Sequence, residues 1–260
     1  MTSVRAVYWC LRVAAAACFI GHGAFGIITK AAWVPYFGVV GIPEAWAWKL
    51  MPVVGTVDIA AGISVLLSPR PFVLLYMAAW ATWTALLRPL SGDSSFEAIE
   101  RAGNSGVPLA LLLLCGWPRD LRAWFRHLTP PLATTPPGTL GRVLGWTTAL
   151  LLFGHGALAG LTAKPVLASH FALVGLPPNA IAIAGWGEMV AAAAVVARPT
   201  PVLLLAIAAW KMATEALYPM SGTPIWEFVE RAGSYAAPLA LALILIDARS
   251  TVLTLRRSSE

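Results

Sequence analysis

The chain has 260 residues, of which 58% are hydrophobic and 12% charged, and its mean hydropathy is +0.74. Soluble domains carry roughly a quarter of charged residues, so a soluble globular protein is excluded, as is a disordered chain. Three cysteines are too few for a disulfide framework. The net charge of +6 is scattered between apolar runs, which indicates no nucleic-acid surface. The composition predicts an all-α, polytopic membrane protein whose partner is the lipid bilayer.

Eight apolar stretches along the chain are long enough to be membrane-spanning helices, which need roughly 17 to 25 residues. The first follows Arg5 and contains no small-residue cleavage site before Lys30, which favours a retained helix over a signal peptide. Proline- and glycine-rich breaks separate the later stretches. The predicted helices cover residues 6–29, 50–68, 71–88 and 97–117, and then 140–162, 179–197, 201–218 and 227–247.

The second four stretches repeat the first four. The segment EAIERAG at 97–103 recurs as EFVERAG at 227–233, an offset of 130 residues (227 minus 97), and GHGA at 21–24 recurs at 154–157. Matches at a nearly constant offset indicate a tandem duplication. We predict a first four-helix repeat at 1–127, a proline-rich linker at 128–139 and a second four-helix repeat at 140–260.

The number of helices and the basic residues together predict the topology. Four helices per repeat is an even number, so both repeats enter the membrane from the same side and a pseudo-two-fold axis runs along the membrane normal. Eleven of the 18 lysines and arginines fall on the side that both termini share, against six on the opposite side. By the positive-inside rule, both termini are expected in the cytoplasm.

Ionisable residues inside apolar helices are costly, and each is therefore a candidate functional residue. His22 and His155 lie toward the outer end of the first helix of each repeat, and a role in helix packing is the alternative for both. The flanking Gly23 and Gly156 would let a backbone or a flat ligand approach the imidazoles closely. An imidazole beside a carboxylate can relay protons, bind a quinone carbonyl or hold a metal, and the spacing does not choose among these.

Asp58 and Glu188 lie at equivalent positions in the second helix of each repeat. A carboxylate at that depth must be protonated or paired. We expect Asp58 to pair with His22 or Arg101, and Glu188 to pair with their counterparts His155 or Arg231.

The fourth helix of each repeat opens with a charged cluster on one helix face. Glu97 and Ser94 fit a capping box, and Thr223 with Pro224 fits a helix start, so capping is the favoured interpretation of Glu97 and Glu227. The residues that follow extend beyond a cap and favour a site or a buried network: Glu100, Arg101, Glu230 and Arg231. Lys211 and Glu215 have alanines at the equivalent positions, and we expect them to pair only with each other.

These motifs resemble the DoxX/DoxD-like membrane proteins, whose members typically have four membrane helices. The first repeat carries Arg12, GHG at 21–23, Lys30 and FGVVGIP at 37–43, and the second carries GHG at 154–156, Lys164 and FALVGLP at 171–177. Glu188 fits the family's usual glutamate, whereas Asp58 departs from it. The resemblance implies redox association, because one branch looks like the small subunit of thiosulfate:quinone oxidoreductase. It also implies a bacterial inner membrane.

Two hypotheses of function follow. The first is a redox-associated membrane subunit, linked to a quinone or a metal and working with a partner subunit, with two pseudo-equivalent sites near the outer leaflet. The second is a non-enzymatic transporter or lipid-handling protein that uses the interface between repeats as a substrate path; a scaffold subunit is a third reading. The candidate catalytic residues are His22, His155, Asp58, Glu188, Glu100, Arg101, Glu230 and Arg231, and the candidate ligand-binding residues are His22, His155, Gly23 and Gly156.

Overall fold

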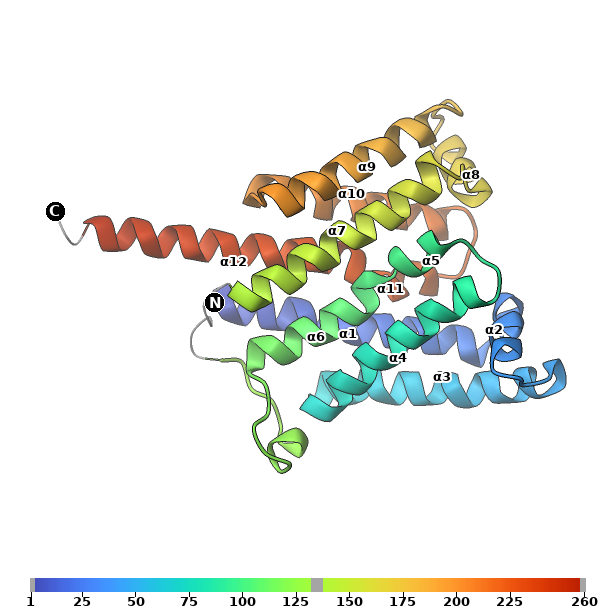
Figure 1. Cartoon of the computed structure of the whole chain (residues 1–260), viewed down its shortest axis with the longest axis horizontal. Coiled ribbons are helices and arrows are strands. Elements are labelled where there is room, and N and C mark those ends of the chain that lie inside the picture. The colour runs from blue at the N-terminus through green and yellow to red at the C-terminus, as the bar shows by residue number, and fades with distance from the viewer. Residues whose placement is uncertain (1–2, 132–137, 258–260) are drawn as a thin grey trace.

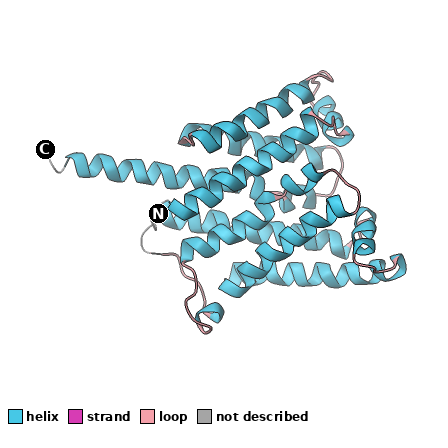
Figure 2. Ribbon diagram, viewed as in Figure 1, coloured by secondary structure: helices cyan, strands magenta, loops and turns pink. Residues whose placement is uncertain are grey.

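A computed structural model describes residues 3–131 and 138–257, in which all regular secondary structure is helical (Figures 1 and 2). Residues 132–137, the central part of the predicted linker, lie outside the described residues. Within these described ranges, six helices are long and apolar enough to cross a membrane, so the chain fits a multi-pass membrane protein. They are α1 (Ser3–Ile27), α3 (Glu44–Leu67), α4 (Pro71–Leu90), α7 (Gly138–Gly160), α9 (Ala180–Ala197) and α10 (Pro201–Met220).

The fourth helix predicted in each repeat is broken instead of continuous. The first is divided into α5 (Ser95–Ile99) and α6 (Ala102–Cys115), and the second into α11 (Trp226–Glu230) and α12 (Ala232–Arg257). At the first break, Arg101 donates to the backbone carbonyl of Glu97 at 2.6 Å, which competes with the helical hydrogen bonds. The 14 residues of α6 extend about 21 Å, less than the roughly 30 Å hydrocarbon core.

Short helices that the sequence did not predict follow the first helix of each repeat. In the first repeat they are η1 (Ala31–Trp33) and α2 (Val34–Val39), and in the second α8 (Pro165–Leu173). Another short helix, η2 (Ala123–Phe125), precedes the linker. Helices α2 and α8 lie at the end of the molecule opposite the two chain ends (Figure 1).

The boundaries of α4 and α10 have the same local chemistry in both repeats. Each helix begins with a proline, Pro71 or Pro201, whose fixed φ suits the first helical position. Beyond their C-terminal ends the chain turns through Gly92 and Gly222, whose φ values of +101° and +87° favour glycine. The proline and glycine breaks of the sequence therefore mark these helix ends correctly.

The packing of the helices also occurs twice. In the first repeat α1 packs against α3, and in the second α7 packs against α9. Helix α1 then packs against α11 and α12, while α7 packs against α5 and α6, so the first helix of each repeat contacts the broken helix of the other. The equivalent glycines Gly103 and Gly233 contact each other, and a Cβ on Gly103 would lie 2.9 Å from the carbonyl carbon of Gly233. Contact between equivalent residues is what a two-fold relation produces.

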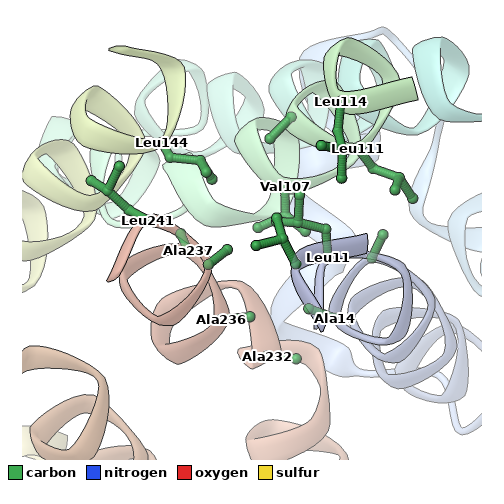
Figure 3. Packing of buried hydrophobic residues seen from close by; sticks show 14 of the residues in the cluster. Leu11, Ala14, Val107, Leu111, Leu114, Leu144, Ala232, Ala236, Ala237 and Leu241 are labelled. Carbon is green, nitrogen blue, oxygen red and sulfur yellow. The ribbon is translucent and has the colours of Figure 1, made fainter. Parts of the chain in front are cut away.

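The main hydrophobic core lies between the repeats. Small and branched side chains from α1, α6, α7 and α12 meet there (Figure 3). In contrast, helices α3 and α9 expose apolar side chains such as Val53, Ile183 and Val190, at 57%, 68% and 68%. Apolar surface of this kind suits contact with lipid. The core residues shown include Leu11, Ala14, Val107, Leu111, Leu144, Ala236 and Leu241.

Candidate functional site

The charged residues converge on the interface between the two repeats. A cavity of about 20 Å³ lies there, which is room for roughly one or two water molecules. Side chains from both repeats line it, so six of the predicted site residues share one cavity instead of forming two separate sites. Its charged and histidine lining consists of His22, Glu100, Arg101, His155, Lys211, Glu215, Glu230 and Arg231.

Ion pairs cross the interface in both directions. Lys30 Nζ lies 2.6 Å from Glu227 Oε1 in the other repeat, and the equivalent Lys164 pairs with Glu97. These ion pairs between the repeats form because α1 packs tightly on α11 and α12, and α7 packs on α5 and α6. At Gly21, for example, a Cβ would lie 2.6 Å from the backbone nitrogen of Glu230.

The histidine of the first repeat has a different partner from the one expected. His22 Nδ1 lies 3.4 Å from Glu230 Oε2, across the interface, and its ring stacks on Trp33 with centroids 4.4 Å apart. The expected pairing of His22 with Asp58 is therefore reduced to an electrostatic interaction without a hydrogen bond. Asp58 is 0% exposed, and neither of its carboxylate oxygens has a hydrogen-bond partner among the described residues.

The histidine of the second repeat pairs as predicted. His155 Nδ1 lies 2.6 Å from Glu188 Oε2, and the other oxygen of Glu188 accepts a hydrogen bond from Trp210 Nε1 at 2.7 Å. Glu188 is 4% exposed, and the Lys211 ammonium lies 3.8 Å from it. Its charge is therefore compensated from three directions.

Among the described residues, neither arginine has an ion pair with Asp58 or Glu188, so those alternative pairings are wrong. Arg101 Nη1 contacts Glu97 at 3.0 Å and Glu100 at 2.5 Å. Arg231 contacts Glu215 at 3.1 Å and Glu227 at 3.3 Å. Glu215 also pairs with Lys211, which lies 3.8 Å from Glu188, so Arg231 is connected to Glu188 through these two residues.

The capping interpretation is only partly correct. Ser94 caps α5, because its Oγ accepts a hydrogen bond from Phe96 N at 3.3 Å. The Glu97 side chain bonds with Lys164 and Arg101 instead of completing a capping box. Helix α11 begins at Trp226, beyond Thr223, and no side-chain hydrogen bond caps it.

Lys211 and Glu215 belong to the charged network, although the sequence did not predict them as part of the common site. Lys211 is 1% exposed, and its Nζ lies 3.0 Å from Glu215 Oε1. Their spacing of four residues predicted this pair, but the missing counterparts at Ala81 and Ala85 gave no reason to place it in a common site. The structure places both residues at the central cavity.

Tyr36 and Arg88 are functional candidates that the sequence did not reveal. Arg88 Nη1 donates to Tyr36 Oη at 3.0 Å, and Tyr36 donates to Asp93 at 2.9 Å. Burial raises the pKa of the Tyr36 hydroxyl above its ordinary value. In the second repeat, His170 on α8 stacks edge-on against Tyr218, and burial lowers the pKa of its imidazole. An alignment of the two repeats through α2 and α8 places Tyr36 opposite His170 and Arg88 opposite Tyr218, and only such an alignment could have identified these positions from the sequence.

A second, largely apolar cavity of about 230 Å³ lies beside the central one, in the first repeat. Val53 and Trp83 line it and are exposed at 57% and 40%, so the cavity opens onto the outer surface of the helix bundle. Trp80 and Arg88 are in its wall, and their buried Nε1 and Nε atoms have no close hydrogen-bond partner in the part of the chain that the structure describes. The other lining residues include His22, Trp33, Tyr36, Phe37, Met51 and Thr84.

The residues near the two cavities bear on the two cofactor classes that the sequence left open. Among the described residues, no group of three or more His, Cys, Asp and Glu side chains is placed to hold a metal ion. The apolar cavity is lined by side chains of types that carry hydrogen-bond donors, among them His22, Trp80 and Arg88. Donors of these types match a ligand with hydrogen-bond acceptors, such as carbonyl oxygens.

Taken together, the described residues form a helical structure that fits a multi-pass membrane protein, with a buried charged cluster where the two halves of the chain meet. A scan against protein-family models, a search of curated proteins and a search of solved structures each found no match.

Proposed function

We propose that the chain crosses the membrane eight times, as two parallel four-helix repeats with both termini in the cytoplasm. The repeated contact pattern, the contact of Gly103 with Gly233 and the distribution of basic residues support this arrangement. In it, α5 with α6, and α11 with α12, form the fourth spans. We also propose membership of the DoxX/DoxD-like family and a place in a bacterial inner membrane, on the motifs described above.

We further propose that the protein binds a quinone-like molecule, dissolved in the membrane, in the apolar cavity beside His22. The observation that carries this proposal is a lipid-facing, largely apolar cavity whose wall includes the imidazole of His22. Its volume of about 230 Å³ exceeds that of a roughly 150 Å³ apolar cavity that accepts benzene. A substituted ring therefore fits, with a polar group toward His22.

His22 has the geometry of a proton acceptor in this site. Its Nδ1 faces the Glu230 carboxylate, which leaves Nε2 as the nitrogen able to take a proton from a ligand hydroxyl. Glu230 would then stabilise the imidazolium, as a carboxylate does for a catalytic histidine. Oxidation of a quinol releases protons with its electrons, and a partner subunit would receive the electrons.

Binding of decyl-benzoquinone to the purified protein in detergent tests the proposal. We expect saturable binding to the wild type, at least about 10-fold weaker binding to His22→Ala, and no binding when Val53→Trp fills the mouth. His155→Ala is the matched control and should bind like the wild type, because His155 does not line this cavity. Absence of saturable binding, or equal losses in the two histidine variants, would contradict the proposal.

The second candidate is a transporter or lipid-handling protein that uses the interface between repeats. The charged cavity at that interface favours it, because transporter sites form between repeats. At about 20 Å³ the cavity is too small for a substrate larger than water, so transport requires the repeats to separate. Flux into proteoliposomes that is lost in both Asp58→Asn and Glu188→Gln would support this candidate over the first.

A further inference from the structure

The two equivalent carboxylates of the duplicated chain have opposite surroundings. Glu188 has hydrogen bonds with His155 and Trp210, at 2.6 and 2.7 Å, and a lysine ammonium at 3.8 Å. A carboxylate with these partners is stable in its charged form, even when it is buried. Glu188 therefore has the contacts of a permanently ionised group.

Asp58 lacks close partners of this kind. The indole of Trp80, the counterpart of Trp210, interacts with the Asp58 carboxylate, but among the described residues neither the indole N–H nor the two carboxylate oxygens have a close hydrogen bond. Aspartate is one methylene shorter than glutamate, which explains why the indole contact is weaker than the 2.7 Å bond of the second repeat. The ionisable groups that interact with Asp58 are His22 and Cys18 on α1 and Tyr76 on α4, and His22 faces Glu230.

The ammonium that faces Glu188 is also missing from the first repeat. The counterpart of Lys211 is Ala81, and the counterpart of Glu215 is Ala85. At Ala81 there is a small cavity of about 10 Å³, lined also by His22, Trp80 and Thr84. This is room for roughly one water molecule. The first repeat thus has a water-sized cavity at Ala81, where the second repeat has the ammonium group of Lys211.

We propose that Asp58 is a neutral carboxylic acid, whereas Glu188 is a fixed carboxylate. A buried carboxylate without close partners is far more costly than a buried carboxylic acid in the same place, because the charge loses its hydration. Equivalent positions of the two repeats accordingly hold one protonated and one ionised group. The inference holds whether or not a quinone binds in the neighbouring apolar cavity.

Infrared spectroscopy of the full chain in lipid tests the inference, since the C=O stretch of a protonated carboxylic acid is separate from carboxylate bands. At neutral pH we expect this band in the wild type, with a shift on exchange into D₂O. The band should disappear in Asp58→Asn and remain in Glu188→Gln.

A second pair of variants keeps Asp58 and tests how its protonation depends on a nearby positive charge. Ala81→Lys places an ammonium where the second repeat has Lys211, and should remove the carboxylic acid band. Ala81→Met has a similar size without the charge, and should retain the band. The inference is overturned if the wild type lacks the band, if the band survives Asp58→Asn, or if Ala81→Met removes it as fully as Ala81→Lys does.

Discussion

Single residues show how one methylene group changes a buried site. Asp58 and Glu188 occupy equivalent positions, yet only Glu188 reaches its histidine and tryptophan. The sequence predicted that both residues would be buried and would matter together with the histidines. It predicted the histidine partner of Glu188 correctly but not the surroundings of Asp58, because a difference of one side-chain bond decides whether a hydrogen bond forms.

The first prediction compares these two carboxylates. Glu188→Gln should lower the free energy of unfolding by about 3 kcal/mol, because it removes the negative charge that faces His155 and Lys211. Asp58→Asn should change it by less than about 1 kcal/mol, because no hydrogen bond is removed. Reversible unfolding in mixed micelles measures both values. Equal losses would show that Asp58 has a partner of similar strength.

At the scale of elements, the predicted spans agree with six of the helices, while the fourth span of each repeat was predicted without its break. Apolar length predicts a helix well, since any long apolar run must satisfy its backbone hydrogen bonds internally. The breaks arise where charged side chains meet the opposite repeat, at Arg101 and Arg231. These contacts join residues far apart in the sequence, so the local pattern of apolar and polar residues does not predict them.

The second prediction concerns the contact between α6 and α12. Gly103→Ala should lower the free energy of unfolding by about 1–3 kcal/mol, because a Cβ would lie 2.9 Å from the backbone of Gly233. Gly187→Ala is the control: this glycine on α9 has open space around it, and alanine should stabilise the helix by about 0.5–1 kcal/mol. Thermal unfolding in detergent compares the two. A loss at Gly187 as large as that at Gly103 would assign the effect to the helix and not to the interface.

For the whole molecule, the repeats are joined by their core and by ion pairs that cross between them. The third prediction tests whether α5 and α6 together cross the membrane. After replacement of Cys10, Cys18 and Cys115, a membrane-impermeant maleimide should label Asp93→Cys in intact cells. Arg119→Cys, on the other side of the broken helix, should be labelled only after permeabilisation.

The same pair of cysteines also defines the opposite outcome. Labelling of both from the outside would mean that the broken helix does not cross and that the eight-helix topology is wrong. Labelling of Arg119→Cys alone would reverse the predicted orientation. Both positions are exposed in the structure, so burial in the protein does not limit the reaction.

The sequence by itself determined that the chain is helical with several apolar helices that fit a membrane protein, that its motifs occur twice, and which ionisable residues are costly to bury. These properties follow from composition, apolar length and repeated motifs, all of which are local. Only the tertiary structure decided that the charged residues share one interface, that His22 pairs with Glu230, and that Asp58 lacks the close hydrogen bonds of Glu188. Those outcomes depend on how α1 and α7 cross the broken helices, because atoms brought together by packing, and not their spacing along the chain, determine which charges meet.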